Sequence, residues 1–197
     1  EIYTLSLTTL SDLLHLVERV GHRGLGSAIL KGIETSASLG AEIVVYMDAD
    51  LSHNPSDISR LLHALDSSSK QPFDIAIGSR RVPGGKIVGW SWRRHVASFL
   101  VNWFTRNVLR VPVRDASSGF RAIRLRAIQD VDFENIAEGY AFQEDFLWRA
   151  HRLGASITEV PITFVNRNIG TSKVNFKELF WSTLALLKIA RQTWLGF

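Results

Sequence analysis

The sequence contains no cysteine among its 197 residues. A disulfide framework, a zinc-thiolate site and a cysteine nucleophile are therefore excluded. Long apolar runs are also missing: the longest candidate, residues 180–187, is followed at once by Lys188. This is far short of the roughly 20 residues that a membrane-spanning helix needs. With 46% hydrophobic and 21% charged residues, the composition indicates one α/β domain over residues 1–197.

Acidic residues are missing from one long segment of the chain. Between Arg80 and Arg114 there are eight basic residues and no acidic one. Such a block predicts an anionic partner: phosphates, anionic lipid or nucleic acid. The same block holds Trp90, Trp92 and Trp103, which are half of the tryptophans. Basic residues interleaved with tryptophan are typical of a lipid–water interface at least as much as of a nucleic-acid groove.

Apolar periodicity and turn residues predict alternating strands and helices. The expected strands are 13–17, 42–47, 73–78 and 156–164, with a further one after 115–120, and the expected helices are 27–39, 57–66, 92–109, 142–153 and 175–195. This order predicts a mostly parallel sheet flanked by helices, with 42–47 as a central strand covered on both faces. Ligands of such sheets bind at the carboxyl ends of the strands. Segments 48–53, 78–85 and 115–121 are therefore expected to form one site.

Asp48 and Asp50 directly follow the apolar strand 42–47. Two carboxylates at this spacing can converge on one hard cation, such as Mg²⁺ or Mn²⁺, with phosphate oxygens and water completing the coordination. The alternative is an Asx-turn or a helix N-cap at either residue. A strand-terminal position favours the metal site.

The helix expected at 92–110 carries polar and basic residues along one stripe and apolar residues along another side. The first set is Arg94, Ser98, Asn102, Arg106 and Arg110, and the second is Val96, Phe99, Leu100 and Trp103. An ordinary surface helix would pack its apolar side on the sheet, whereas an interfacial helix would lay it on a membrane. The absence of acidic residues favours the membrane.

Several motifs now stand in one order along the chain. They are Asp48-Ala49-Asp50-Leu51-Ser52-His53, Gly78-Ser79-Arg80, Asp115-x-x-Ser118-Gly119-Phe120-Arg121, Gly139-Tyr140-x-Phe142-Gln143, Glu159-Val160-Pro161-Ile162-x-Phe164 and Arg167-x-x-Gly170-x-Ser172-Lys173. The series resembles the dolichol-phosphate (polyprenol-phosphate) mannosyltransferases, which are GT-A, family 2 glycosyltransferases. The likeness runs from about Val17 to the C-terminus. The ordered series is more specific than any one motif.

The resemblance implies a GT-A (Rossmann-like) fold and transfer of mannose, with inversion, from GDP-mannose to dolichyl or polyprenyl phosphate. It implies that Asp48 and Asp50 hold Mg²⁺ or Mn²⁺ against the donor diphosphate, and that Asp145 lies near the sugar. The catalytic residues would be Asp50, Asp145 and Arg94. Because a phosphate acceptor is already ionised, no strong general base is required. Catalysis then depends mainly on stabilising the negative charge of the leaving diphosphate.

The resemblance also implies partners and a location. The residues expected around the phosphates of donor and acceptor are Arg80, Arg94, Arg167 and Lys173. Asp48 is expected to bind the donor diphosphate through the metal ion. The expected location is peripheral, at the cytoplasmic face of the ER or plasma membrane. Amphipathic helices at 92–110 and 176–195 would lie at the membrane–water interface. A membrane subunit is a candidate partner, and no nucleic acid is expected to bind.

Residues 1–14 depart from the family pattern. Members begin with an apolar strand, a Pro-x-Tyr-Asn-Glu-like loop and a second strand ending in Asp-Asp-Gly-Ser, which bind the base and ribose. None of these is present in 1–14, so we expect a family member without its N-terminal base-binding segment. Two alternatives remain: a glucosyl or other hexosyl transferase acting on the same lipid phosphate, and a non-catalytic membrane-associated module with the same fold.

Overall fold

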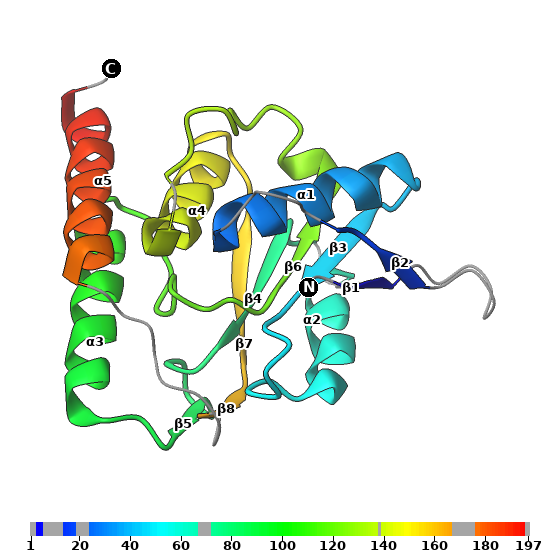
Figure 1. Ribbon diagram of the computed structural model, residues 1–197, viewed down its shortest axis with the longest axis horizontal. Coiled ribbons are helices and arrows are strands. Elements are labelled where there is room, and N and C mark those ends of the chain that lie inside the picture. Colours follow the sequence, from blue (N-terminus) through cyan, green and yellow to red (C-terminus); the bar gives the residue numbers. More distant parts are fainter. Residues whose placement is uncertain are drawn as a thin grey trace.

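A four-stranded sheet with helices on both faces forms the centre of the structure (Figure 1). The computed structural model describes residues 3–5, 14–18, 24–66, 72–137, 139–166 and 176–195. The helices are α1 (Leu25–Ser38), α2 (Ile58–Leu65), α3 (Trp92–Asn107), α4 (Phe142–Arg152) and α5 (Phe176–Leu195), with 3₁₀ turns η1 (Pro55–Asp57), η2 (Leu125–Ala127) and η3 (Gly139–Ala141). The strands are β1 (Tyr3–Leu5), β2 (Leu14–Leu16), β3 (Ile43–Tyr46), β4 (Ile75–Ser79), β5 (Lys86–Val88), β6 (Arg121–Arg124), β7 (Ile157–Pro161) and β8 (Thr163–Val165).

The main sheet has the order β3-β6-β4-β7. Strand β6 runs antiparallel to both of its neighbours, and β4 and β7 are parallel. The predicted α/β fold with helices around the sheet is confirmed, but the sheet is mixed. The chain reaches β6 from α3 through the loop 108–120. Along this described part of the chain, no helix packed on the sheet returns the chain to the starting end of the strands, so β6 begins where β3 and β4 finish and runs in the opposite direction.

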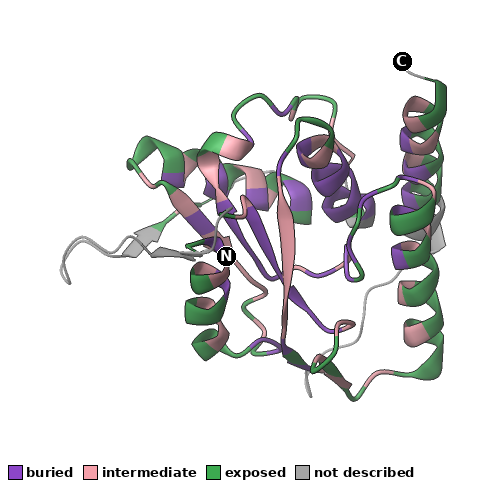
Figure 2. Ribbon diagram, turned by 180° about the vertical axis from the view of Figure 1, so that it is seen from behind, coloured by how far each residue is buried: buried purple, intermediate pink, exposed green. Residues whose placement is uncertain are grey.

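Two apolar cores lie on the two faces of this sheet. Along β4, Ile75 and Ile77 face the larger core while Ala76 faces the smaller one, as the two-residue period of a strand requires. The larger core includes residues of α1, α4 and α5. The smaller core includes Leu61 and Leu65, which lie one turn apart on α2. Figure 2 shows the resulting burial, with α4 largely buried and α3 and α5 exposed over much of their length.

The prediction that strand 42–47 is central was wrong. In the part of the chain that the structure describes, β3 pairs only with β6 and stands at the edge of the sheet. Of its four residues only Val44 is buried. The inner strands are β6 and β4, and all five residues of β4 are buried. A continuous apolar run identifies a strand with apolar cover, but it does not identify the strand's neighbours.

The C-terminal strand region also differs from the prediction. Residues 156–164 were expected to form one strand, but the chain breaks at Ile162 into β7 and β8. Strand β8 pairs in parallel with β5, which the sequence did not predict, in a separate two-stranded sheet. Strand β1, which pairs antiparallel with β2, was not predicted either. The other helices and strands begin and end within a few residues of their predicted positions.

Helix α3 turns its polar side toward the protein and its apolar side outward, the reverse of an ordinary surface helix. Its apolar residues Val96, Phe99, Leu100 and Trp103 are 48–57% exposed, whereas Asn102 and Thr105 are buried. Helix α5 likewise exposes apolar residues, namely Trp181, Leu184, Leu187, Trp194 and Leu195. Among the described residues, none of the helices is long and apolar enough to cross a bilayer.

Candidate active site

The predicted site segments meet at one edge of the main sheet. Tyr46, the last residue of β3, and Ile77, two residues before the end of β4, both stand opposite Arg121, the first residue of β6. The loops that follow β3 and β4 and the loop that precedes β6 therefore leave the sheet on the same side. The hydroxyl of Ser118 donates to the carbonyl of Gly78 at 2.6 Å, which joins two of these loops directly. The prediction that 48–53, 78–85 and 115–121 lie together is confirmed.

Buried polar atoms without partners gather at the same edge. Among the described residues, six side-chain atoms are fully buried without a hydrogen bond: Oγ of Ser52, Nδ1 and Nε2 of His53, Nε of Arg81, Nε1 of Trp90 and Nε2 of Gln143. They lie in the loops after β3 and β4, in the loop between β5 and α3, and at the start of α4 beside the end of β3. An unpaired buried polar atom costs about 1–3 kcal/mol, and folded proteins keep such atoms mainly where they have a task. Their concentration marks this edge as the site.

Asp48 and Asp50 leave the end of β3 in different environments. The Asp48 side chain is 45% exposed, and a Cβ added at Gly119 would lie 3.2 Å from its Oδ1. Gly119 therefore lets the backbone of the 115–120 loop approach this carboxylate closely. Asp50 Oδ1 accepts a hydrogen bond from the backbone N–H of Ser52 at 3.0 Å. The Asx-turn is thus present at Asp50, and it fixes one of its oxygens while Asp48 faces outward.

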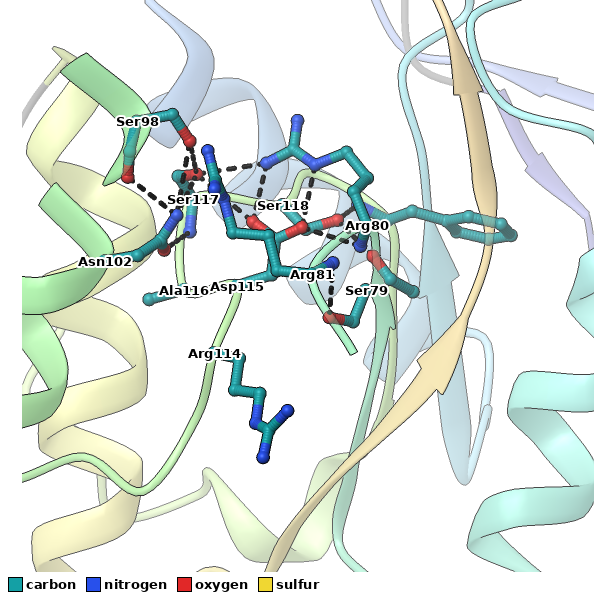
Figure 3. Close-up of polar contacts among 12 residues, drawn as sticks. Ser79, Arg80, Arg81, Ser98, Asn102, Arg114, Asp115, Ala116, Ser117 and Ser118 are labelled. Carbon is teal, nitrogen blue, oxygen red and sulfur yellow. Dashed lines mark hydrogen bonds and ion pairs between the residues drawn. The ribbon is translucent and has the colours of Figure 1, made fainter. Parts of the chain in front are cut away.

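Arg80 and Asp115 form the central ion pair of the site (Figure 3). Nε and Nη2 of Arg80 donate to the two oxygens of Asp115, both at 2.7 Å, and the Arg80 backbone N–H adds a third bond at 2.8 Å. Burial acts to raise the pKa of Asp115, but the hydrogen bonds and charge of Arg80 outweigh it and leave that pKa below its ordinary value. The carboxylate therefore holds the arginine in place as a fixed, charged unit.

Arg80 also lies against an aromatic pair together with Arg94. The guanidinium carbons of Arg80 and Arg94 are 4.9 and 4.1 Å from the centroid of Trp90, and 5.4 and 5.7 Å from that of Phe164. Arg94 additionally donates to Oδ1 of Asn166 at 2.9 Å. Two residues predicted to bind phosphate are therefore close neighbours, stacked on the same rings. Their phosphate-binding role stays a prediction.

The other two predicted phosphate-binding residues, Arg167 and Lys173, lie outside the described residues. The half-buried Arg81, next to Arg80, was not predicted as a site residue. Burial lowers the pKa of Arg81, the charge of Asp115 opposes this, and Arg80 adds to the lowering. Two adjacent guanidinium groups with one buried carboxylate leave a local excess of positive charge.

Asp145 of α4 is buried and binds within the protein. Its Oδ2 accepts the backbone N–H of Ala137 at 2.7 Å and its Oδ1 accepts Nε of Arg149 at 2.8 Å, while Arg149 also donates to the carbonyl of Asn135. In this arrangement Asp145 fastens the 132–137 loop to α4. Its predicted role near the sugar stays a prediction.

A second buried polar group lies beneath the loops, at the start of α4. The Tyr46 hydroxyl donates to Oε1 of Gln143 at 3.1 Å, and Arg121 donates to the Gln143 carbonyl at 3.1 Å. Glu144 is 2% exposed, and burial raises its pKa to about 7, against the attraction of Arg121 and Arg80. Burial also raises the pKa of the Tyr46 hydroxyl, while Arg121 acts to lower it.

A separate hollow lies away from these loops. A cavity of about 660 Å³ is lined by residues 124–126 and by residues of α1, at the opposite end of β6 from the loops described above. It contains none of the predicted site residues. The convergence of charged side chains, rather than hollow volume, locates the site.

A hydrogen-bond network connects the site to α3. The Ser117 hydroxyl accepts from Nη2 of Arg80 at 3.0 Å and lies 3.3 Å from Nδ2 of Asn102 and 3.4 Å from Oγ of Ser98. The Asn102 amide oxygen accepts the Ser117 backbone N–H. Figure 3 shows Ser98 and Asn102 reaching toward Ser117 from the helix, while the Arg114 side chain points away. The buried side of α3 is therefore part of the support of the site.

Comparison with known proteins places the chain in a family. Residues 5–132 match the family described as Glycosyl transferase family 2. The chain is a family 2 glycosyltransferase. It is 40% identical over 189 residues to a polyprenol monophosphomannose synthase from Mycolicibacterium smegmatis, covering 91% of this chain and 70% of the relative. It is 40% identical over 163 residues to an undecaprenyl-phosphate mannosyltransferase from Micrococcus luteus, covering 82% of this chain and 65% of that relative.

Solved structures give the fold of this glycosyltransferase. Glucosyl-3-phosphoglycerate synthase from Mycobacterium tuberculosis, bound to uridine diphosphate, superposes with a TM-score of 0.56 at 17% identity. The same enzyme with Mn²⁺, UDP-glucose and glycerol 3-phosphate gives 0.57 at 18% identity. Each match covers 87% of this chain and 55% of the solved chain. The predicted resemblance and glycosyltransferase class are confirmed; the two neighbours support the fold.

Besides Arg81, four residues of the site were missed by sequence reasoning. Asp115 was quoted only as part of a motif, and Asn102 only as part of a stripe. The third, His53, was likewise read only as the end of a motif. Glu159, on β7, accepts the backbone N–H groups of residues 114 and 115 and so holds the Asp115 loop. A signal existed for Asp115, since it is the first acidic residue after the basic block.

Proposed function

We propose that this glycosyltransferase transfers mannose, with inversion, from GDP-mannose to polyprenyl or dolichyl phosphate at the surface of a membrane. The two relatives named for polyprenol-linked mannose transfer support the acceptor and the sugar. The observation that carries the proposal is the meeting of Asp48 and Asp50 with Arg80 and Arg94 around one sheet edge. Carboxylates for a divalent cation and arginines for phosphates are what transfer between a diphosphate and a lipid phosphate requires.

The chemistry of the loop after β3 fits Mg²⁺ or Mn²⁺. Asp48 offers an outward-facing carboxylate, Asp50 lies two residues on, and the buried hydroxyl of Ser52 has no partner among the described residues. These are hard oxygen ligands of the type that both ions prefer. The described residues hold no cluster of three or more metal-binding side chains, so diphosphate and water would supply the remaining ligands. A bound cation would stabilise the negative charge of the departing diphosphate.

The residues of the chain itself have three tasks in this proposal. Arg94 stacks on Trp90 at the exposed end of the site, where it binds and orients the acceptor phosphate. Arg80, held by Asp115, sets the positive potential of the site. Because the acceptor phosphate is ionised already, Asp145 is not needed as a base, and it holds the loop 132–137 against α4.

The membrane part of the proposal depends on α3 and α5. Their exposed apolar side chains form a surface flanked by the basic residues Arg93, Arg106 and Arg110. An apolar stripe with basic flanks and exposed tryptophan is typical of helices that lie in a bilayer interface. We place the protein peripherally on the cytoplasmic side of the ER or plasma membrane, with a membrane subunit as a candidate partner.

Calorimetry tests the donor. The purified chain is titrated with GDP and with UDP in the presence and absence of Mn²⁺, and transfer from GDP-mannose and from UDP-glucose to polyprenyl phosphate is followed with labelled sugars. We expect Mn²⁺-dependent binding of GDP and transfer of mannose. Transfer of glucose instead would favour the hexosyl alternative. Absence of GDP binding at millimolar concentration would overturn the proposal and favour a non-catalytic module.

Vesicle sedimentation tests the membrane surface. Arg106→Glu changes two charge units on the proposed interface, whereas Arg126→Glu makes the same change on an exposed residue of η2, at the far edge of the sheet. At about 1 kcal/mol per charge, Arg106→Glu is expected to weaken binding to anionic vesicles roughly thirtyfold. The Arg126 variant should sediment like the wild type. Equal losses in the two variants would indicate non-specific attraction.

A further inference from the structure

His53 is a buried histidine without a hydrogen bond. Its side chain is 1% exposed and lies between the rings of Phe120 and Phe164, with centroid distances of 5.1 and 5.2 Å. Neither ring nitrogen has a hydrogen-bond partner among the described residues. Burying an imidazole in this way costs about 1–3 kcal/mol. A phenylalanine would fill the same aromatic space without that cost, so packing alone does not account for a histidine.

One side of the imidazole faces the proposed metal site. Its Nε2 lies 3.6 Å from Oδ2 of Asp48, which is within ion-pair range but too long for a hydrogen bond. A Cβ added at Gly119 would lie 3.2 Å from Oδ1 and 3.4 Å from Oδ2 of Asp48, so the 115–120 loop passes close to the carboxylate. The carboxylate therefore lies between the buried ring and the 115–120 loop, with its remaining side exposed. The two aromatic neighbours fix the ring, so the carboxylate is the part able to move.

We propose that His53 is a positioning residue for Asp48, a role that rests on the metal site of the proposed function. The Nε2–H of His53 donates to Oδ2 of Asp48 when the cation is bound, which orients the carboxylate toward the cation. Carboxylate ligands of metals commonly receive such a hydrogen bond, and its loss costs about 10–100-fold in metal affinity. Asp48 is half-exposed and can contact the cation, whereas His53 is buried behind it and can only hold the Asp48 carboxylate in place.

A matched pair of amide variants tests this role without any sugar donor. His53→Gln can present its amide N–H near the position of Nε2, whereas His53→Asn is one methylene shorter and cannot reach Oδ2. Mn²⁺ affinity is measured by the loss of the free-ion electron paramagnetic resonance signal. We expect His53→Asn and His53→Phe to weaken Mn²⁺ binding about 10–100-fold and His53→Gln to restore most of it. His63→Phe, on the exposed side of α2, is the control.

The outcomes separate the role of His53 from the proposed function. If His53→Phe and His53→Asn bind Mn²⁺ as tightly as the wild type, His53 does not position the ligand. A ¹⁴N coupling typical of directly bound imidazole in the pulsed spectrum of the Mn²⁺ complex would overturn positioning in favour of ligation. A wild-type chain that binds no Mn²⁺ overturns both the metal site and the role of His53. A chain that binds Mn²⁺ with the expected variant pattern but transfers no mannose contradicts the proposed function alone.

Discussion

Glu144 gives a prediction whose magnitude follows from its burial. Burial raises its pKa from 4.5 to about 7, with Arg121 and Arg80 opposing and Asp115 assisting. At about 1.4 kcal/mol per pH unit, the ionised carboxylate costs about 3 kcal/mol of folding stability. The unfolded chain releases this proton near pH 4.5 and the folded chain only near pH 7. Stability from this group is therefore full below about pH 4.5 and falls as the pH rises to about 7.

Glu144→Gln replaces the carboxyl with a neutral group of nearly the same shape. Urea unfolding of both chains is followed by tryptophan fluorescence at about pH 5 and at about pH 8. The wild type should lose about 2–3 kcal/mol more than the variant between these two conditions. Glu134→Gln, at an exposed position, serves as the control and should follow the wild type. Parallel losses in wild type and Glu144→Gln would show that Glu144 ionises as an exposed glutamate does, and would refute the reasoning.

Three further substitutions test the packing around the site. Asp115→Asn leaves Arg80 buried without its carboxylate, so urea unfolding at neutral pH should show a loss of about 3–5 kcal/mol. Gly26→Ala places a methyl group 2.6 Å from a ring atom of Phe142, and the overpacking should lower the unfolding free energy by about 1–3 kcal/mol. Gly119→Ala crowds the first carboxylate of the Asp-x-Asp motif, so calorimetry should show weaker Mn²⁺ binding while the melting temperature changes little. An unchanged unfolding free energy for Asp115→Asn would show that the ion pair with Arg80 does not stabilise the fold. An unchanged unfolding free energy for Gly26→Ala, or unchanged Mn²⁺ affinity for Gly119→Ala, would show that the neighbouring side chains make room for the new methyl group.

Local patterns predicted the elements of this fold better than their arrangement. The apolar spacing of α1 and α2 and the capping glycine Gly40, which has a φ of 80°, located helices and their ends. The direction of β6 could not be read in this way, because strand direction depends on where the chain crosses the sheet and no short-range signal records it. The edge position of β3 was missed for the same reason.

The site was predicted as a set of segments rather than as a set of contacts. The rule that ligands meet the carboxyl ends of strands brought three loops together correctly. The pairing of Arg80 with Asp115 depends on side chains 35 positions apart, and the orientation of α3 depends on Ser98 and Asn102 finding Ser117. Such long-range polar contacts leave no periodic pattern in the sequence. The two stripes of α3 are visible in the sequence, and the absence of acidic residues favoured an exposed apolar side, which the structure has; the polar contacts that hold the helix in this orientation were not predicted.

Helix α3 acts as a spacer in the proposed membrane-bound state. Ser98 and Asn102 bind the loop of the site on one side of the helix, while Phe99, Leu100 and Trp103 are exposed on the opposite side. A helix with its side chains is about 10 Å thick. The Asp115 loop would then stand one helix diameter above the plane in which the apolar side chains rest. A lipid phosphate would have to rise out of the headgroup layer by a comparable height, so the length of its flexible prenyl chain becomes a geometric requirement of the acceptor.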